Sequence, residues 1–132
     1  MGRLFISYSR KDKKYASKLA KKLQKENFEV WIDDRINYGG QWPLAIETAI
    51  DHCEFFILIA SENSYQSEWV QNEVARAKRI NKKIFPLLLS GNPWLSFETI
   101  QFFDVRDEKL PNKKFYFDLR SYQNQRFDRW DS

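Results

Sequence analysis

Polar side chains that could do chemistry gather directly after three short apolar runs of the sequence. The clusters are Ser7-Tyr8-Ser9-Arg10, Asp33-Asp34 and the stretch from Ser61 to Ser67. If the apolar runs are parallel strands, these clusters meet beyond the carboxyl ends of the strands, where open α/β sheets bind ligands near the point at which strand order reverses. Hydroxyl, guanidinium and carboxylate groups would then share one crevice.

The residue types present exclude several well-known chemistries of such a crevice. A phospho-receiver site needs an acidic pair after the first strand and an aspartate after the third, but this chain has Ser7-Tyr8-Ser9 and Ser61 there. Neither GxGxxG nor GxxxxGK followed by Ser or Thr occurs, which excludes a Rossmann dinucleotide site and a P-loop. His52 and Cys53 lack partners at catalytic or metal-ligand spacing, so we interpret them as helix-end and core residues and expect no metal.

Apolar spacing predicts the elements that position these clusters. The expected strands are 4–6, 28–32, 55–60, 84–89 and 115–117, and Phe55 to Ala60 should be central because it is apolar without alternation. One helix should run from a candidate N-cap at Asp12 to Asn27, a second should begin at Pro43, and a third should run from about Ser67 to Asn81. The apolar positions of these helices are Tyr15, Ala16, Leu19, Ala20 and Leu23; Ile46, Ala49, Ile50 and Cys53; and Val70, Val74 and Ala77.

Two segments fit this pattern less simply. Pro86 lies inside an expected strand and cannot donate to the ladder, so one edge of that strand must be interrupted there. Residues 122–132 are polar and aromatic and suit the region of a terminal helix. The alternation of strands and helices predicts an α/β fold: a flavodoxin-like open parallel sheet of five strands with helices on both faces.

Composition places the chain among globular domains. It has 132 residues, 42% of them hydrophobic and 17% aromatic, which is enough for the core of one domain. Cys53 is the only cysteine and no apolar run reaches the length of a membrane helix, so we expect a cytoplasmic protein. The net charge of +4 arises mostly from lysines between Lys11 and Lys25, interpreted as the solvated face of one helix, and we expect neither nucleic acid nor membrane as a partner.

Four motifs, in the right order, resemble those of Toll/interleukin-1 receptor (TIR) domains. Phe5 to Asp12 is similar to the first box of the family, and Val30 to Asp33 to its second strand. Gly40 to Ile50 resembles the glycine-containing BB loop and the helix that follows it. Ser67, Trp69 and Glu73 match the spacing S-x-W-x-x-x-E. The likeness covers about residues 3–120, and it implies one TIR domain of the NAD+-consuming prokaryotic type over residues 1–132, normally fused to a sensing domain.

In catalytic members of that family, cleavage of NAD+ depends on the glutamate of the last motif, which implies a catalytic role for Glu73. Trp69 and Glu73 are four residues apart, so on a helix they share a face. A carboxylate beside the ribose can stabilise the oxocarbenium character that builds at C1, and nicotinamide leaves as a neutral molecule without a general acid. By position alone, Glu73 could instead be an exposed helix residue paired with Arg76 or Lys78.

The same resemblance implies the substrate-binding residues. Ser9 and Arg10 would line the nucleotide pocket, Arg10 with its planar donor fork at the pyrophosphate, although it could also be a plain surface arginine. The full substrate-binding set is Ser9, Arg10, Asp33, Gly40, Trp42, Ser67, Trp69 and Trp94. Trp42 could stack on a ring of the ligand or simply anchor the next helix, Asp33 could only cap a turn, and Trp94 would contribute to a composite site between protomers.

The resemblance implies an NAD+ glycohydrolase or ADP-ribosyl cyclase, with NAD+ as the substrate, no cofactor, and self-association with other TIR domains that completes the site. It fits innate-immune or anti-phage signalling. Two alternatives remain open: a non-catalytic TIR module that only assembles, and a nucleoside deoxyribosyltransferase-like enzyme, which the first box disfavours. The pattern does not separate hydrolysis from cyclisation.

Overall fold

The described part of the chain forms the expected parallel sheet with helices on both faces. A computed structural model describes residues 3–32 and 44–131, with side chains as far as residue 123. The strand order is β2-β1-β3-β4-β5, and every neighbouring pair is parallel. The strands are β1 (Arg3–Ser7), β2 (Glu29–Ile32), β3 (Phe55–Ala60), β4 (Lys83–Leu88) and β5 (Phe103–Asp104). The α-helices are α1 (Lys13–Lys25), α2 (Leu44–His52), α3 (Glu62–Tyr65), α4 (Glu68–Arg79) and α5 (Lys113–Asp131), and short 3-10 turns are η1 (Arg10–Asp12), η2 (Leu95–Phe97) and η3 (Arg106–Glu108).

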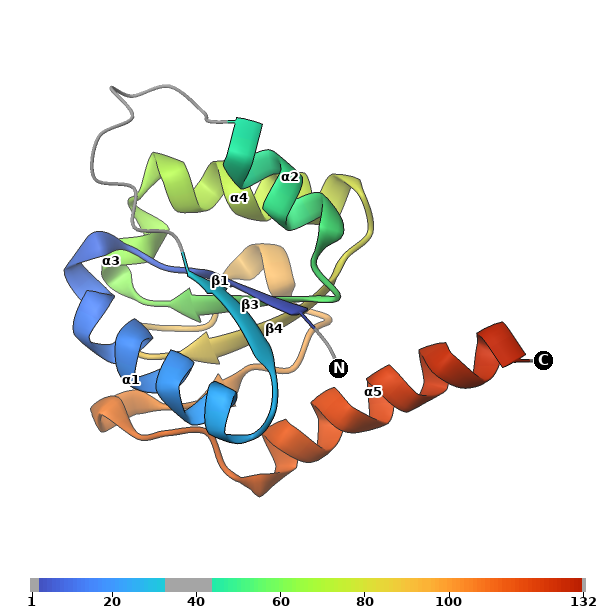
Figure 1. Ribbon diagram of the computed structural model, residues 1–132. Helices are drawn as coiled ribbons and strands as arrows, with labels where there is room; N and C mark the ends of the chain where they lie inside the picture. Colours follow the sequence, from blue (N-terminus) through green and yellow to red (C-terminus); the bar gives the residue numbers. More distant parts are fainter. Residues whose placement is uncertain (1–2, 33–43, 132) are drawn as a thin grey trace.

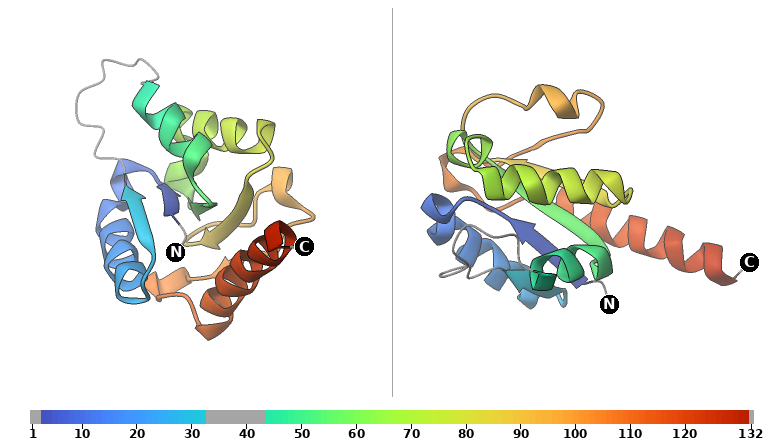
Figure 2. Two further views of the ribbon diagram at one scale, coloured as in Figure 1. Left: turned by 45° about the vertical axis from the view of Figure 1, so that its right-hand side comes forward. Right: turned by 90° about the horizontal axis from the view of Figure 1, so that it is seen from above.

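Two apolar layers hold the helices against the sheet. Helices α1 and α5 cover one face and α2 and α4 the other, as Figures 1 and 2 show from three directions. Strand β3 faces both layers: Phe55 and Ile57 belong to the layer under α1 and α5, and Phe56 and Leu58 to the layer under α2 and α4. All six β3 residues are buried, which confirms the prediction that this run without alternation is a central strand.

Strand order reverses between β1 and β3. The chain leaves β1 to one side for β2 and returns on the other side for β3, so the connections at the carboxyl edge diverge there, in the order typical of flavodoxin-like sheets. Ser7 ends β1 and Ser61 directly follows β3 at this edge. The sheet therefore brings the first and third polar clusters of the sequence to one place.

The helix boundaries follow local chemistry. Helix α1 ends before Asn27, whose φ of 70° is left-handed, and α4 begins after Ser67, whose hydroxyl accepts a hydrogen bond from the Val70 amide at 3.3 Å. Asp12 stands at the N-cap position of α1, but its side chain does not cap the helix. Lys13, Lys14, Lys18, Lys21 and Lys25 are exposed on α1, so the lysine run is the solvated helix face that the pattern indicated.

The prediction of a strand at 115–117 is wrong. Phe115 lies in α5, where it shares a buried side with Leu119, four residues on, while Phe117 is 68% exposed. The aromatic triplet has the residue types of a strand, but its burial follows the helical period. The fifth strand is Phe103–Asp104, which is too short for any periodicity to reveal. The stretch from Ser61 to Ser64, expected as a loop, contains the start of α3.

Pro86 sits where one edge of β4 is interrupted, as expected. It pairs with Leu58 of β3, whereas β5 pairs with β4 only at Leu87 and Leu88. Among the described strands, Pro86 therefore has a paired residue on one side only. Because no strand pairs with it on the other side, the N–H that proline lacks is not required there.

Candidate active site at the carboxyl edge of the sheet

A hollow of about 260 Å³ opens at this edge, between the exit of β1 and the start of α4. Its walls are Ser9, Arg10, Lys11, Ser67 and Trp69. Four of these were singled out from the sequence as substrate-binding residues, and the fold brings them together from two distant segments. Lys11 was not singled out, although it directly follows Arg10 of the first cluster. The hollow is therefore hydroxyl-lined, aromatic on one side and rimmed by two cations.

The two serines of the hollow are held by backbone groups. The Ser9 hydroxyl accepts a hydrogen bond from the Lys11 amide at 3.3 Å, which begins η1 and turns Arg10 and Lys11 outward, where both are exposed. The Ser67 hydroxyl accepts from the Val70 amide as the cap of α4. Because each hydroxyl is the acceptor in these bonds, it can still donate its own proton to an oxygen of a ligand.

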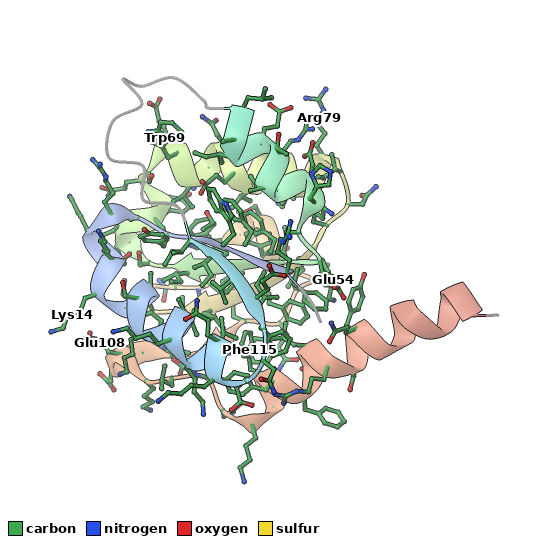
Figure 3. The ribbon with its side chains drawn as sticks, in the orientation of Figure 1. Lys14, Glu54, Trp69, Arg79, Glu108 and Phe115 are labelled. Atoms are coloured by element: carbon green, nitrogen blue, oxygen red, sulfur yellow. The ribbon has the colours of Figure 1, made fainter. Side chains whose placement is uncertain are left out.

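Glu73 lies one helical turn along α4 from Trp69 and has no exposed surface. Its Oε1 accepts a hydrogen bond of 2.6 Å from the Ser7 hydroxyl, and Oε2 is buried as well. The alternative that Glu73 is a solvent-facing partner of Arg76 or Lys78 is wrong. Arg76 instead donates to Asp51 of α2, and Lys78 to the Ser96 carbonyl. Figure 3 places Trp69 at the amino-terminal end of α4.

A second set of polar groups fixes the loop that carries Ser9 and Arg10. The Asp12 carboxylate accepts a hydrogen bond of 2.6 Å from the Ser61 hydroxyl and one of 3.1 Å from Asn63. The Ser61 hydroxyl also accepts from the Ser64 amide at 3.0 Å, as the cap of α3. Ser61 therefore holds the loop after β1 and the start of α3 together.

Trp94 lies apart from the first hollow. It lines a second hollow of about 360 Å³ with Ser61, Tyr65 and Gly91, its ring 5.3 Å from that of Tyr65, and it is only 5% exposed. The predicted binding residues Asp33, Gly40 and Trp42 lie outside the described residues. Their place relative to the hollow stays a prediction.

Cys53 and His52 behave as structural residues. Burial raises the pKa of the Cys53 thiol to about 11, which suppresses the thiolate that a nucleophile needs. The His52 ring shares a hydrogen bond of 2.9 Å with the Thr48 carbonyl at the end of α2. Among the side chains described, those of residues 3–32 and 44–123, no three from His, Cys, Asp or Glu gather to hold a metal ion. No helix in the part of the chain that the structure describes has the length and apolar character to span a membrane.

Ser7 is the site residue that sequence reasoning missed. It lay in a named cluster but was assigned no role, because its partner is 66 residues away. Its position two residues after Phe5 was the available indication, since alternate residues of a strand share a face.

The whole described fold has known relatives. Residues 4–129 match the family model for the TIR domain. TIR2 of Cytobacillus dafuensis, named as a candidate cyclic ADP-D-ribose synthase, is 24% identical over 115 residues, which cover 81% of this chain and 30% of that protein. The chain therefore spans less than a third of the length of this relative.

Two solved structures share the fold. The TIR domain of the Toll-related receptor TRR-2 from Hydra magnipapillata has a TM-score of 0.63 at 17% identity, covering 77% of this chain and 84% of that chain. The CMP N-glycosidase BcmB of Clostridium botulinum has a TM-score of 0.61 at 22% identity, covering 81% of this chain and 92% of that one. Both likenesses concern the arrangement of strands and helices.

Proposed function

This chain belongs to the TIR domain family, and from that premise we propose that it cleaves the bond between nicotinamide and ribose in NAD+. The products are nicotinamide and either ADP-ribose or a cyclic ADP-ribose. The observation that carries the proposal is the Glu73 carboxylate, buried at the carboxyl edge of the sheet and bonded to Ser7, one turn of α4 from a hollow with two cations. The name of the Cytobacillus relative agrees with this reaction class.

In the proposed reaction, Glu73 acts on the ribose. Departure of nicotinamide leaves positive charge on the ribose C1 and ring oxygen, and a carboxylate in a water-poor site stabilises that charge far better than one in solvent. Nicotinamide leaves as a neutral base, so no proton donor is needed. Water then attacks C1 in hydrolysis, or an atom of the same molecule attacks it in cyclisation.

The hollow suits the rest of the substrate. Arg10 offers a planar set of donors to a pyrophosphate, and Lys11 adds a second positive charge at the rim. The amino-terminal end of α4, next to Ser67, favours negative charge through the helix dipole. Trp69 supplies an aromatic face against which a flat ring can stack.

The burial of Glu73 supports a further part of the proposal, that self-association completes the site. Its carboxylate has no exposed surface in the single chain, so the site must open before a ribose can reach it. In this proposal, contact with neighbouring TIR domains supplies that opening. Activity per molecule should then rise with protein concentration. Such coupling suits a signalling role in innate immunity or anti-phage defence.

The decisive experiment measures nicotinamide release by chromatography after concentrated protein is incubated with NAD+. Wild type should release nicotinamide, and Glu73→Gln, which keeps the shape of the side chain and removes its charge, should lose at least about 100-fold in rate. The matched control is Glu54→Gln, a change of the same kind at the opposite end of β3, which should retain the wild-type rate.

Equal release by Glu73→Gln and wild type would remove Glu73 from the mechanism. No release by wild type, at any concentration and under conditions that promote assembly, would favour the rival proposal of a TIR module that only assembles. Consumption of free nucleosides in place of NAD+ would point to the deoxyribosyltransferase-like alternative.

A further inference from the structure

The hydrogen bond between Ser7 and Glu73 joins two side chains that both lack exposed surface, one at the end of β1 and one on α4. We propose that Ser7 is a positioning residue, whose hydroxyl holds the Glu73 carboxylate in the orientation that the reaction requires. This inference rests on the proposed function and extends it to a residue that does not touch the reacting atoms.

The register of β1 explains why Ser7 reaches Glu73. Phe5 points into the layer under α2 and α4, and Ser7, two residues later, points the same way. Across the sheet Phe5 pairs with Phe56 and Ser7 with Leu58, both in that layer. The position thus lies in an apolar layer, yet a small hydroxyl residue occupies it. The space that a larger side chain would fill is where the carboxylate of α4 is received.

The hydrogen bond between Ser7 and Glu73 is short. The O–H···O separation of 2.6 Å lies in the range of charge-assisted hydrogen bonds between a hydroxyl and a carboxylate. A serine hydroxyl has one proton, and donating it to Oε1 limits rotation of the carboxylate about its last torsion. When a catalytic group is already held in this way, less of the activation free energy is needed to orient it. The backbone adds precision, since Ser7 pairs with Leu58 of β3 and Ile6 before it pairs with both β2 and β3.

A merely structural bond would make a different prediction. If Ser7 only stabilised the fold, its loss would reduce the amount of folded protein and leave the turnover of each folded molecule unchanged. If Ser7 orients Glu73, its loss reduces kcat in protein that is fully folded, while KM changes little because Ser7 lies outside the wall of the hollow.

The experiment compares wild type with Ser7→Ala and Ser7→Thr, measuring kcat and KM for nicotinamide release together with thermal unfolding. We expect Ser7→Ala to lower kcat about 10- to 100-fold, the effect of removing one hydrogen bond to a charged group, with KM within about 3-fold of wild type. Ser7→Thr keeps the hydroxyl but adds one methyl group in a packed layer, so its kcat should lie clearly above that of Ser7→Ala although below wild type.

The control is Tyr15→Phe. This change also deletes a buried hydroxyl with a 2.6 Å bond, here to the Lys109 carbonyl, but on the α1 face of the sheet. Its melting temperature should fall, and its kcat should match wild type. The positioning role would be overturned if folded Ser7→Ala had the kcat of wild type. It would also be overturned if Tyr15→Phe lost as much kcat as Ser7→Ala.

The two proposals fail in different ways. A wild-type protein that releases no nicotinamide overturns the proposed function and this inference with it. Release that depends on Glu73 but not on Ser7 overturns the inference alone. A Ser7→Thr variant that folds, yet is as slow as Ser7→Ala, would also count against the hydroxyl.

Discussion

The Asp12 carboxylate ties the loop that carries Ser9 and Arg10 to the start of α3, and breaking this link should reveal a measurable coupling energy. In Ser61→Ala, the hydroxyl that donates to Asp12 at 2.6 Å is lost, together with the cap that receives the Ser64 amide at 3.0 Å. A lost cap costs about 1 kcal/mol. A lost hydrogen bond to a carboxylate costs about 1.5 kcal/mol, the low end of the usual range because Asp12 is half-buried. The free energy of unfolding of Ser61→Ala should therefore fall by about 2.5 kcal/mol.

The bond itself is isolated by a double-mutant cycle of wild type, Ser61→Ala, Asp12→Ala and the double variant. Asp12→Ala loses the same bond and also the one from Asn63. The cost of the shared bond should be counted once in the double variant, which gives a coupling of about 1 to 1.5 kcal/mol. Urea unfolding followed by circular dichroism, with equal m values for all four proteins, supplies the numbers.

A coupling below about 0.3 kcal/mol would refute this reasoning, because contacts that do not interact are additive within that margin. The control is Ser17→Ala on α1, which should change the free energy of unfolding by less than about 0.5 kcal/mol. A fall in Ser17→Ala as large as that in Ser61→Ala would show that serine loss in general, rather than this link, is being measured.

Three further predictions concern stability. Burial raises the pKa of the Cys53 thiol to about 11, so the thiol of the unfolded chain ionises at lower pH than that of the folded protein. The contribution of Cys53 to the free energy of unfolding is therefore complete below about pH 8.5 and falls as pH rises towards 11, by up to about 1.4 kcal/mol per pH unit. Urea midpoints should show this decline, and Cys53→Ala should flatten it. Hydrogen bonds from the Arg76 guanidinium lower the pKa of Asp51, so this pair stabilises the fold above about pH 4, and the stabilisation is lost as pH falls further. In thermal melts, Arg76→Gln should lose less stability than wild type as pH falls. Added salt should reduce this difference between the two proteins. Gly91→Ala should cost about 1 kcal/mol in urea unfolding, because φ is +76° there; the new Cβ would also approach Glu62 Cγ at 3.2 Å, and an unchanged midpoint would contradict the conformational argument.

The parts of the fold that the sequence predicts are those where burial and period agree. Phe55 to Ala60 is apolar at every position and proves to be the central strand, and Ser67 caps α4 where its residue type indicated. Phe115 to Phe117 misleads because aromatic residues favour strands, whereas only the spacing to Leu119 shows the helix. The two-residue β5 has no period at all, and only its pairing with β4 defines it.

The candidate site divides in the same way. Trp69 and Glu73 are one helical turn apart, so their common face follows from the sequence alone. Ser7 and Glu73 are 66 residues apart, and their bond requires the strand order and the register of β1. The Asp12 side chain had a local use as a helix cap but bonds to Ser61 instead, which no local pattern distinguishes.

The inward face of α4 gives an independent reason to assign Glu73 a function. Its other buried residues are Val70, Val74 and Ala77, and an apolar side chain at position 73 would extend that face without interruption. Burial of an ionised carboxylate costs several kcal/mol, and even well-formed hydrogen bonds such as the one from Ser7 rarely make a buried ion more stabilising than an apolar residue of similar size. Packing alone therefore favours a leucine or methionine there. A carboxylate is the better residue only where its negative charge is used, and in the proposed reaction that use is to stabilise the cation on the ribose C1 of NAD+.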